Sequence, residues 1–175
     1  KEQLDWYRGI DILKRILDYD SKNQSARTEI TECYKEKYAD HSQLDEYVRL
    51  SNLNQNWRNV HEAIEDFEKH ISFDKGNFVC HRSWGVGLIS SIEGDEITID
   101  FARKRAHKMS LKMAVSALMS LTREHIWVLR TIWSKSKLHD KVKEDTKWAL
   151  STVIRSHNNA ANMKMIKAEI APGIL

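Results

Sequence analysis

Apolar residues in the first part of the chain recur at helical spacing. Trp6, Ile10, Leu13 and Leu17 follow one another at steps of four, three and four residues, and a second stripe begins at Ala26 after a polar turn. This spacing places apolar side chains on one face of a helix. The sequence therefore predicts two helices that form a hairpin.

The same layout recurs 34 residues later in the chain. Ile10 then aligns with Leu44, and Ile30 aligns with Ile64. A 34-residue period of paired helices is typical of tetratricopeptide repeats. We therefore predict tetratricopeptide-like helical hairpins over residues 1–72, with coincidental helical periodicity as the alternative.

The last apolar stripe of this segment is its strongest. It contains Trp57, Val60, Ile64 and Phe67, and Asn56 is the expected N-cap. Each hairpin of such a repeat leaves an apolar face open, and about three repeats are normally needed for stability. Because only two are recognisable and the first residue is not Met, we expect the chain to be part of a longer protein.

The spacing of apolar residues shortens to two between residues 73 and 111, where four of the six glycines also fall. We expect strands at 78–81, 88–92, 96–101 and 106–109, with a glycine turn over 84–87 and a basic loop over 103–105. Short strands with one apolar face are not stable as a flat sheet. This segment is therefore predicted to form a small SH3/Tudor-like β-barrel.

Helical spacing returns in a C-terminal helical segment over residues 112–175. Ser110 is the expected N-cap of a helix that reaches Leu121. Further helices are expected around Ile126 to Trp133, Trp148 to Ile154 and Met163 to Ile170, the last of them closed by Pro172 and Gly173. The segment either covers the open end of the barrel or continues the helical stack, and the predicted fold class is α+β.

Composition narrows the class of protein. The chain has 175 residues, of which 41% are apolar and 30% charged, and it contains one proline. These values exclude a disordered or collagen-like chain. No apolar run approaches the roughly 20 residues of a membrane span, so we expect a cytoplasmic protein with no membrane partner. The two cysteines, Cys33 and Cys80, are predicted to be buried thiols in a reducing compartment rather than a disulfide.

Charge is unevenly distributed along the chain. Residues 1–72 carry 11 Lys and Arg against 15 Asp and Glu, a net charge of −4. Residues 73–112 carry 7 against 5, and residues 113–175 carry 10 against 5, net charges of +2 and +5. An acidic first part and a basic second part suggest two surfaces with different partners, and the alternative is a solvated face, which would explain most of this modest excess.

The chain lacks the residue patterns of common catalytic and metal sites. His61 is followed by a glutamate but not by the second histidine of a zinc protease motif. Cys80 and His81 are neighbours on a predicted strand, so they point to opposite faces and do not form a nucleophile and base pair. Gly85 and Gly87 lack the third glycine and the following helix of a dinucleotide site. We therefore expect no enzyme activity, no cofactor and no bound metal.

The candidates for partner binding are basic and aromatic residues of the predicted barrel. Positive charge beside an exposed aromatic ring suits a nucleic-acid backbone or an acidic protein patch. The alternatives are a solvated basic loop and a tryptophan that belongs to the core or rim of the barrel. The candidate residues are Phe78, His81, Arg82, Trp84, Arg103, Lys104, Arg105, His107 and Lys108.

The run GNFVCHRSWGVGLI from Gly76 to Ile89, continued by IEGD at 92–95 and IDF at 99–101, resembles the Tudor-like module of bacterial transcription factors. This module occurs in CarD-type regulators, in the transcription-repair coupling factor and in UvrD-type helicases. The resemblance implies docking onto RNA polymerase. Helical repeats followed by this module, together with KAEIAP at 167–172, are also similar to the N-terminal extension of enlarged Gre-type elongation factors.

Two departures limit what the resemblance implies. Gre-type factors act through a long coiled coil with an acidic tip, and this chain has no sustained heptad pattern, so no transcript-cleavage residues are carried over. CarD-type proteins usually have a proline in the turn that here reads Arg82-Ser83-Trp84.

The expected function is a non-catalytic protein-interaction region of a bacterial transcription elongation factor. Its barrel would dock onto RNA polymerase, and its helical repeats would bind a second protein. The alternative is a module that binds DNA or RNA through the basic rim of the barrel.

Overall fold

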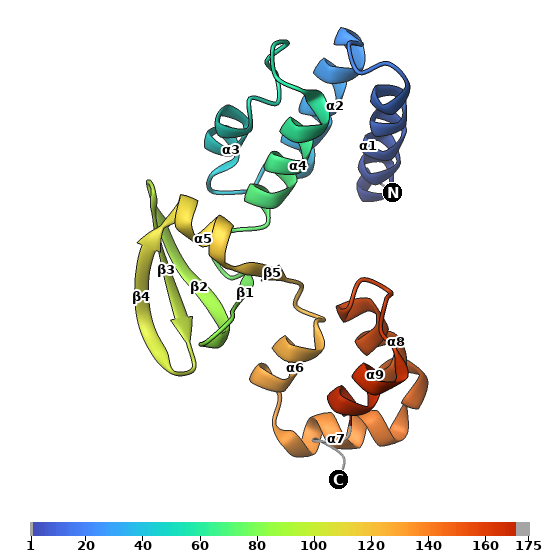
Figure 1. Ribbon diagram of the computed structural model, residues 1–175, viewed down its shortest axis with the longest axis vertical. Helices are drawn as coiled ribbons and strands as arrows, with labels where there is room; N and C mark the ends of the chain where they lie inside the picture. The colour runs from blue at the N-terminus through green and yellow to red at the C-terminus, as the bar shows by residue number, and fades with distance from the viewer. Residues whose placement is uncertain (1, 171–175) are drawn as a thin grey trace. The chain divides into compact units, whose positions relative to one another are not determined.

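A computed structural model describes residues 2–170 of the chain, and it has an α+β fold. The chain divides into two compact units, one up to Lys75 and the other from Gly76 (Figure 1). We describe each unit by itself, and we call them the helical unit and the sheet unit.

The helical unit contains two helical hairpins. Its helices are α1 (Glu2–Tyr19), α2 (Gln24–Lys37), α3 (Leu44–Ser51) and α4 (Val60–Ile71). The predicted helical hairpins are therefore confirmed, whereas their assignment as tetratricopeptide-like remains a prediction.

Asparagine side chains define where two of these helices begin. Asn23 accepts a hydrogen bond from the amide of Ala26 at the start of α2, and Asn59 accepts from the first amides of α4. The predicted N-cap Asn56 is therefore wrong. Trp57 lies ahead of α4 and is 73% exposed, so it is not part of the apolar stripe to which the sequence analysis assigned it.

Aromatic side chains fill the core of the helical unit. Tyr34, Tyr47 and Phe67 are fully buried, and the rings of Tyr34 and Phe67 lie 4.7 Å apart. Both tyrosine hydroxyls are satisfied, since Tyr34 donates to a carboxylate oxygen of Glu68 and Tyr47 donates to the carbonyl of Phe73. The bond of Tyr34 joins α2 to α4 and so ties the two hairpins together, whereas that of Tyr47 joins α3 to the residues that follow α4.

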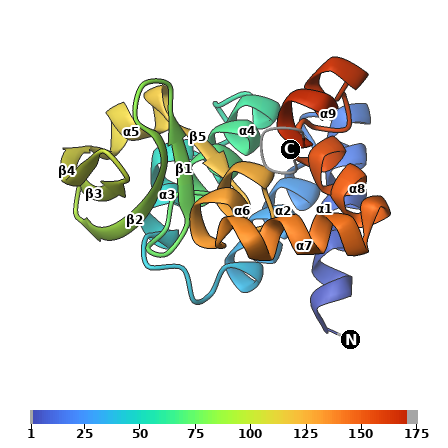
Figure 2. The ribbon, with the colours of Figure 1, turned by 90° about the horizontal axis from the view of Figure 1, so that it is seen from below.

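The sheet unit begins with an antiparallel sheet of five described strands. They are β1 (Phe78–His81), β2 (Gly85–Glu93), β3 (Glu96–Phe101), β4 (Lys104–Ser110) and β5 (Met119–Leu121), in the spatial order β4-β3-β2-β1-β5. The pairing of β2 with β3 and that of β3 with β4 each contain a register shift, which increases local twist. Figure 2 shows β2, β3 and β4 curling rather than lying flat.

The sheet does not close into the predicted barrel. Among the described residues, no ladder joins the two edge strands β4 and β5. The SH3/Tudor-like assignment therefore remains a prediction, and what the structure establishes is a curled open sheet.

Three local expectations for this region are wrong. Gly85 to Gly87 belong to β2 rather than to a turn, and Lys104 and Arg105 belong to β4 rather than to a loop. The helix that begins after Ser110, α5 (Leu111–Ala117), ends before Leu121, which lies in β5. Leu121 joins the sheet because its side chain is buried in one apolar cluster with Phe78 and Val128.

Four helices complete the described part of the sheet unit. They are α6 (Ile126–Ile132), α7 (Lys135–Glu144), α8 (Thr146–Ser156) and α9 (Met163–Ile170). Helix α6 packs against the sheet through Val128, whereas α8 and α9 join it in a second cluster of Ile126, Val153 and Ile166. The sequence analysis did not predict α7, and the predicted helix stop at Pro172 and Gly173 lies outside the described residues.

Within residues 2–170, every helix is too short or too polar to cross a bilayer.

Candidate partner-binding site

The candidate site is built on the turn between β1 and β2. His81 pairs with Gly85 across the hairpin, which leaves Arg82, Ser83 and Trp84 as a three-residue loop. Gly85 has a φ of +73°, a left-handed conformation that glycine adopts without strain. The loop therefore turns tightly and presents Trp84 at its end.

The ring of His81 organises this loop. Its Nδ1 accepts hydrogen bonds from the amides of Ser83 and Trp84, at 3.1 and 3.3 Å. A ring nitrogen that accepts carries no proton, so the proton of neutral His81 is on Nε2. The ring also stacks on Trp84, with centroids 3.9 Å apart and planes inclined by 17°.

Trp84 is half-buried at the centre of a group of aromatic and basic side chains, which we call the Trp84 cluster. The centroid of the Trp84 ring lies 5.4 Å from that of Phe101 and 4.6 Å from that of His107. The Nζ atom of Lys104 lies 4.3 Å from the centroid of the Trp84 ring. The cluster consists of His81, Trp84, Phe101, Lys104 and His107. Phe101 is fully buried, so the other rings of the cluster pack on it from the solvent side.

The second glycine of the Gly-Val-Gly run has a steric role. A Cβ on Gly87 would lie 2.6 Å from Cδ1 of Phe101 and 2.7 Å from Cγ2 of Ile99. Gly87 therefore makes room for the Phe101 ring of the Trp84 cluster, whereas the left-handed conformation of Gly85 lets β2 begin directly after the loop. Glycine is therefore required at these two positions for different reasons: backbone conformation at Gly85 and close packing at Gly87.

Strand β4 supplies the histidine and lysine of the cluster. Ala106 has a φ of +46°, and its amide donates to Oδ1 of Asp100 at 2.8 Å. Burial lowers the pKa of His107, and the positive charge of Lys104 lowers it further. His107 is therefore neutral at neutral pH, and Lys104 places a positive charge in the cluster.

The other predicted site residues fall into three groups. Arg82, Arg103 and Arg105 are exposed, and each is a sequence neighbour of a cluster residue. Lys108 is also exposed, but its Nζ donates to Oε1 of Glu96 at 2.7 Å, and this bond raises the pKa of the lysine. Phe78 is only 8% exposed and packs in the core with Leu121 and Val128, so it is poorly accessible, and its role in partner binding remains a prediction.

The described residues contain no group of three or more histidine, cysteine, aspartate or glutamate side chains that could hold a metal ion. What the arrangement offers chemically is a large aromatic surface with adjacent positive charge, which suits recognition of another macromolecule.

Comparison with known proteins adds a family context. Residues 127–175 match the family model described as the GRAD helix-turn-helix domain. Within that range, α7 and α8 are separated only by Asp145, whose carboxylate accepts from the amide of Trp148 and caps α8. Neither α7 nor a helix-turn-helix domain was predicted from the sequence.

Two curated relatives cover nearly the whole chain. The chain is 53% identical over 175 residues to the "Putative GreA-associated domains protein" of Treponema pallidum. It is 39% identical over 166 residues, 95% of its length, to the "Transcription elongation factor GreA" of Borreliella burgdorferi. The chain spans only 27% and 18% of these relatives, and no solved structure gives a significant match. The similarity to Gre-related proteins that the sequence analysis predicted is confirmed at this level.

Proposed function

We propose that the chain is a non-catalytic interaction region of a bacterial transcription elongation factor and that its sheet unit docks onto RNA polymerase. The observation that carries the proposal is the Trp84 cluster in a chain similar to Gre-related proteins. Such a region works where bacterial transcription takes place, in the cytoplasm.

The geometry of the cluster supports docking onto a protein. A half-buried tryptophan in the same short loop as an exposed arginine, Arg82, is the type of residue group that dominates binding energy at protein interfaces. The stack on His81 and the hydrogen bonds of that ring fix the loop before binding, which lowers the entropic cost of association.

The edges of the sheet are less suited to docking by strand addition. Edge strand β5 has three residues, and edge strand β4 carries Lys104, Arg105 and Lys108 together with an irregular pairing to β3. Short length, lysines and irregularities are features that discourage an edge strand from pairing with another chain. We therefore assign docking to the Trp84 cluster and to Arg82, which lies in the same loop as Trp84.

The test is binding of the 175-residue chain to bacterial core RNA polymerase, measured by interferometry at low salt. We expect Trp84→Ala to weaken binding by about 2 kcal/mol, roughly thirtyfold in Kd. Because this substitution also removes packing, Arg82→Glu at an exposed position of the same loop serves as a second variant, and circular dichroism verifies folding. Absence of binding by the folded wild-type chain would exclude the proposal.

A second candidate function is nucleic-acid binding through the basic rim of the sheet unit. Four exposed cations lie in or beside the cluster, and Lys104 lies over the indole. Removing a cation that binds a phosphate of a single strand lowers the slope of log affinity against log salt by about 0.7. Replacing Arg103, Lys104 and Arg105 by alanine would therefore lower the slope for single-stranded DNA or RNA by about 2. The docking proposal expects little effect of the two arginine substitutions on polymerase binding.

We also propose that the helical unit binds a second protein. Its residues up to 75 carry 12 Lys and Arg against 16 Asp and Glu, whereas residues 76–175 carry 16 against 9. Net charges of −4 and +7 favour different partners for the two units.

A further inference from the structure

The helical unit contains a hollow of about 520 Å³ where the starts of α2 and α4 meet the loop before α4. This volume is within the range of ligand sites, about 300–1,000 Å³. The side chains that matter for its chemistry are Lys22, Arg27, Trp57 and Arg58, and no aspartate or glutamate is among the described residues that line it. We call it the Arg27 hollow.

Arg27 carries a buried charge with no carboxylate partner. Its side chain is 5% exposed, and it donates from Nε to the carbonyl of Leu53 at 3.1 Å and from Nη2 to the carbonyl of Arg58 at 2.8 Å. Within residues 2–170, no carboxylate oxygen lies within 4.0 Å of the guanidinium. Burial lowers the pKa of Arg27, but an arginine remains charged in proteins. Two carbonyl dipoles compensate the charge only in part, so the hollow favours an anion.

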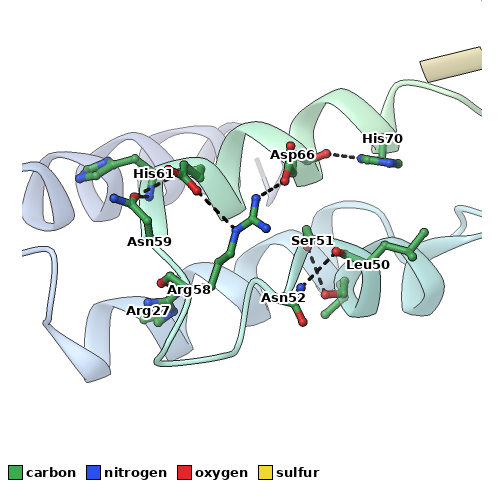
Figure 3. A network of polar contacts seen from close by, with 11 residues as sticks. Arg27, Leu50, Ser51, Asn52, Arg58, Asn59, His61, Asp66 and His70 are labelled. Carbon is green, nitrogen blue, oxygen red and sulfur yellow. Dashed lines mark hydrogen bonds and ion pairs between the residues drawn. The ribbon is translucent and has the colours of Figure 1, made fainter. Parts of the chain in front are cut away.

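The neighbouring cation, Arg58, is already neutralised. Its guanidinium forms an ion pair with Asp66 and approaches Oε2 of Glu62 at 3.8 Å. Figure 3 shows its side chain directed along α4 toward Asp66, while Arg27 lies beside the main chain of Arg58. The unbalanced positive charge of the hollow therefore comes from Arg27 and from the exposed Lys22, which forms no ion pair with the described residues.

Trp57 provides an apolar surface at the same place. It is 73% exposed, yet its loop is fixed at both ends, because Leu53 is fully buried and Arg27 bonds to the carbonyls of Leu53 and Arg58. A large aromatic ring on a pre-ordered loop binds with little further loss of entropy. Trp57 and Arg27 together therefore suit a ligand that carries a negative group next to an apolar one.

We infer that the Arg27 hollow binds an acidic peptide segment of a partner protein, with a carboxylate at Arg27 and Lys22 and an apolar side chain against Trp57. Two of the five N–H groups of Arg27 donate to the two carbonyls, which leaves three for the carboxylate. The inference rests on the proposed second partner of the helical unit and names the chemistry of that partner.

The charge of the unit favours a peptide over a nucleic acid. A nucleic-acid strand brings a row of phosphates and requires an extended positive field. The helical unit has a net charge of −4, from 12 cations and 16 anions, and repels such a strand at long range. A single carboxylate is attracted only once it is inside the hollow, where the uncompensated guanidinium dominates.

The experiment uses an array of short synthetic peptides that combine Asp or Glu with Phe, Leu or Trp in all orders, each paired with its Asn or Gln counterpart. The labelled 175-residue chain is applied to the array, and the affinities of the selected peptides are then measured by anisotropy. We expect the carboxylate peptides to bind about tenfold more tightly than their amide counterparts.

The variants Trp57→Ala and Lys22→Glu alter exposed positions and leave the buried bonds of Arg27 intact. Each variant should bind the selected carboxylate peptides about tenfold more weakly than the wild type does. The matched controls Tyr19→Ala and Lys69→Glu change an exposed aromatic and an exposed lysine of the same unit that do not line the hollow, and they should bind as the wild type does.

Several results would overturn the inference. They are equal binding of carboxylate and amide peptides, wild-type affinity of Trp57→Ala and Lys22→Glu, retention of no peptide at all, or preferential binding of a single-stranded oligonucleotide through Trp57. The Trp57→Ala chain should still bind core RNA polymerase, so a failure here is distinguishable from a failure of the docking proposal.

Discussion

Replacing Gly87 by alanine isolates the packing on which the Trp84 cluster rests. Gly87 lies in β2 and has no left-handed φ, so alanine is allowed by the backbone, and the added methyl group acts only through contact. That methyl carbon would lie 2.6 Å from Cδ1 of Phe101 and 2.7 Å from Cγ2 of Ile99, whereas ordinary contact begins near 3.4 Å. Both neighbours are fully buried, so any shift of their side chains must displace other core atoms.

The size of the effect follows from this overlap. Forcing an extra methyl group into a well-packed core costs about 1–3 kcal/mol. For a unit of this size, each kcal/mol lowers Tm by about 4–8 °C. Because Phe101 supports the indole of Trp84, the substitution should also weaken binding at the cluster.

The assay is calorimetry of the whole chain, with hydrogen exchange of the peptides from β1 to β3 to assign the transition to the sheet unit. The same substitution at Gly9, inside α1, is the matched control. A Cβ there meets only Sγ of Cys33, at 3.8 Å, so Gly9→Ala should stabilise the helical unit by about 0.5–1 kcal/mol.

A double-mutant cycle with Phe101→Leu decides whether the overlap is the cause. If it is, the double variant loses less stability than the sum of the single variants, by at least about 0.5 kcal/mol. Strict additivity, or a Gly87→Ala chain as stable as the wild type, would refute the reasoning.

Three further predictions concern single residues. Ala106→Gly should stabilise the sheet unit by up to about 1 kcal/mol in urea unfolding, because Ala106 has a φ of +46°, and an unchanged or lower stability would contradict this strain. Arg27→Gln should destabilise the helical unit by about 2–3 kcal/mol, since it removes charged donors from two carbonyls, and a loss below about 1 kcal/mol would contradict that role. Burial lowers the pKa of His125, so this residue stabilises the fold above its unfolded pKa of about 6.5, and the contribution is lost as the pH falls through the folded pKa. His125→Asn keeps an acceptor for the amide of Trp127 but does not titrate, and it should lose less stability than the wild type between roughly pH 7.5 and 5.5.

Helices with a full apolar stripe were predictable from sequence. Ile10 and Leu17 lie on one face of α1 and are buried, as their spacing requires. Helix α7 has only two buried apolar residues, Leu138 and Val142, so its periodicity is too weak to detect. These two residues form a cluster with Ala149 of α8, and packing across the chain therefore stabilises this helix more than its own pattern does.

Strand β5 could not be predicted from its local sequence, and the cause differs from that for α7. Leu121 continues the helical spacing of α5, and three residues carry little information about a strand. The segment becomes extended because it pairs with β1, where Leu121 lies opposite Phe78, 43 positions earlier. Such long-range pairing decides structure where local propensity is weak.

The candidate site was predictable in composition but not in geometry. The sequence identified Trp84, His81 and the basic residues, yet it also included Phe78, because alternation alone does not tell which face of β1 is buried. It assigned Trp57 to the core because Asn56 and Asn59 are both acceptable N-caps. Asn59 is the one that caps, and Arg27 of the other hairpin fixes the loop that carries Trp57.

Each unit has a candidate site in which a cation lies near a tryptophan, but the two units differ in net charge. Binding at the two sites should therefore respond differently to salt. At the Trp84 cluster the cations are exposed in a unit with a net charge of +7, so binding of an acidic partner should weaken strongly with salt. At Trp57 the cation is buried in a unit with a net charge of −4, where salt screens a repulsion instead. Raising the ionic strength should therefore weaken binding at the first site more than at the second. Equal salt dependence would mean that the net charge of each unit does not influence binding at its site.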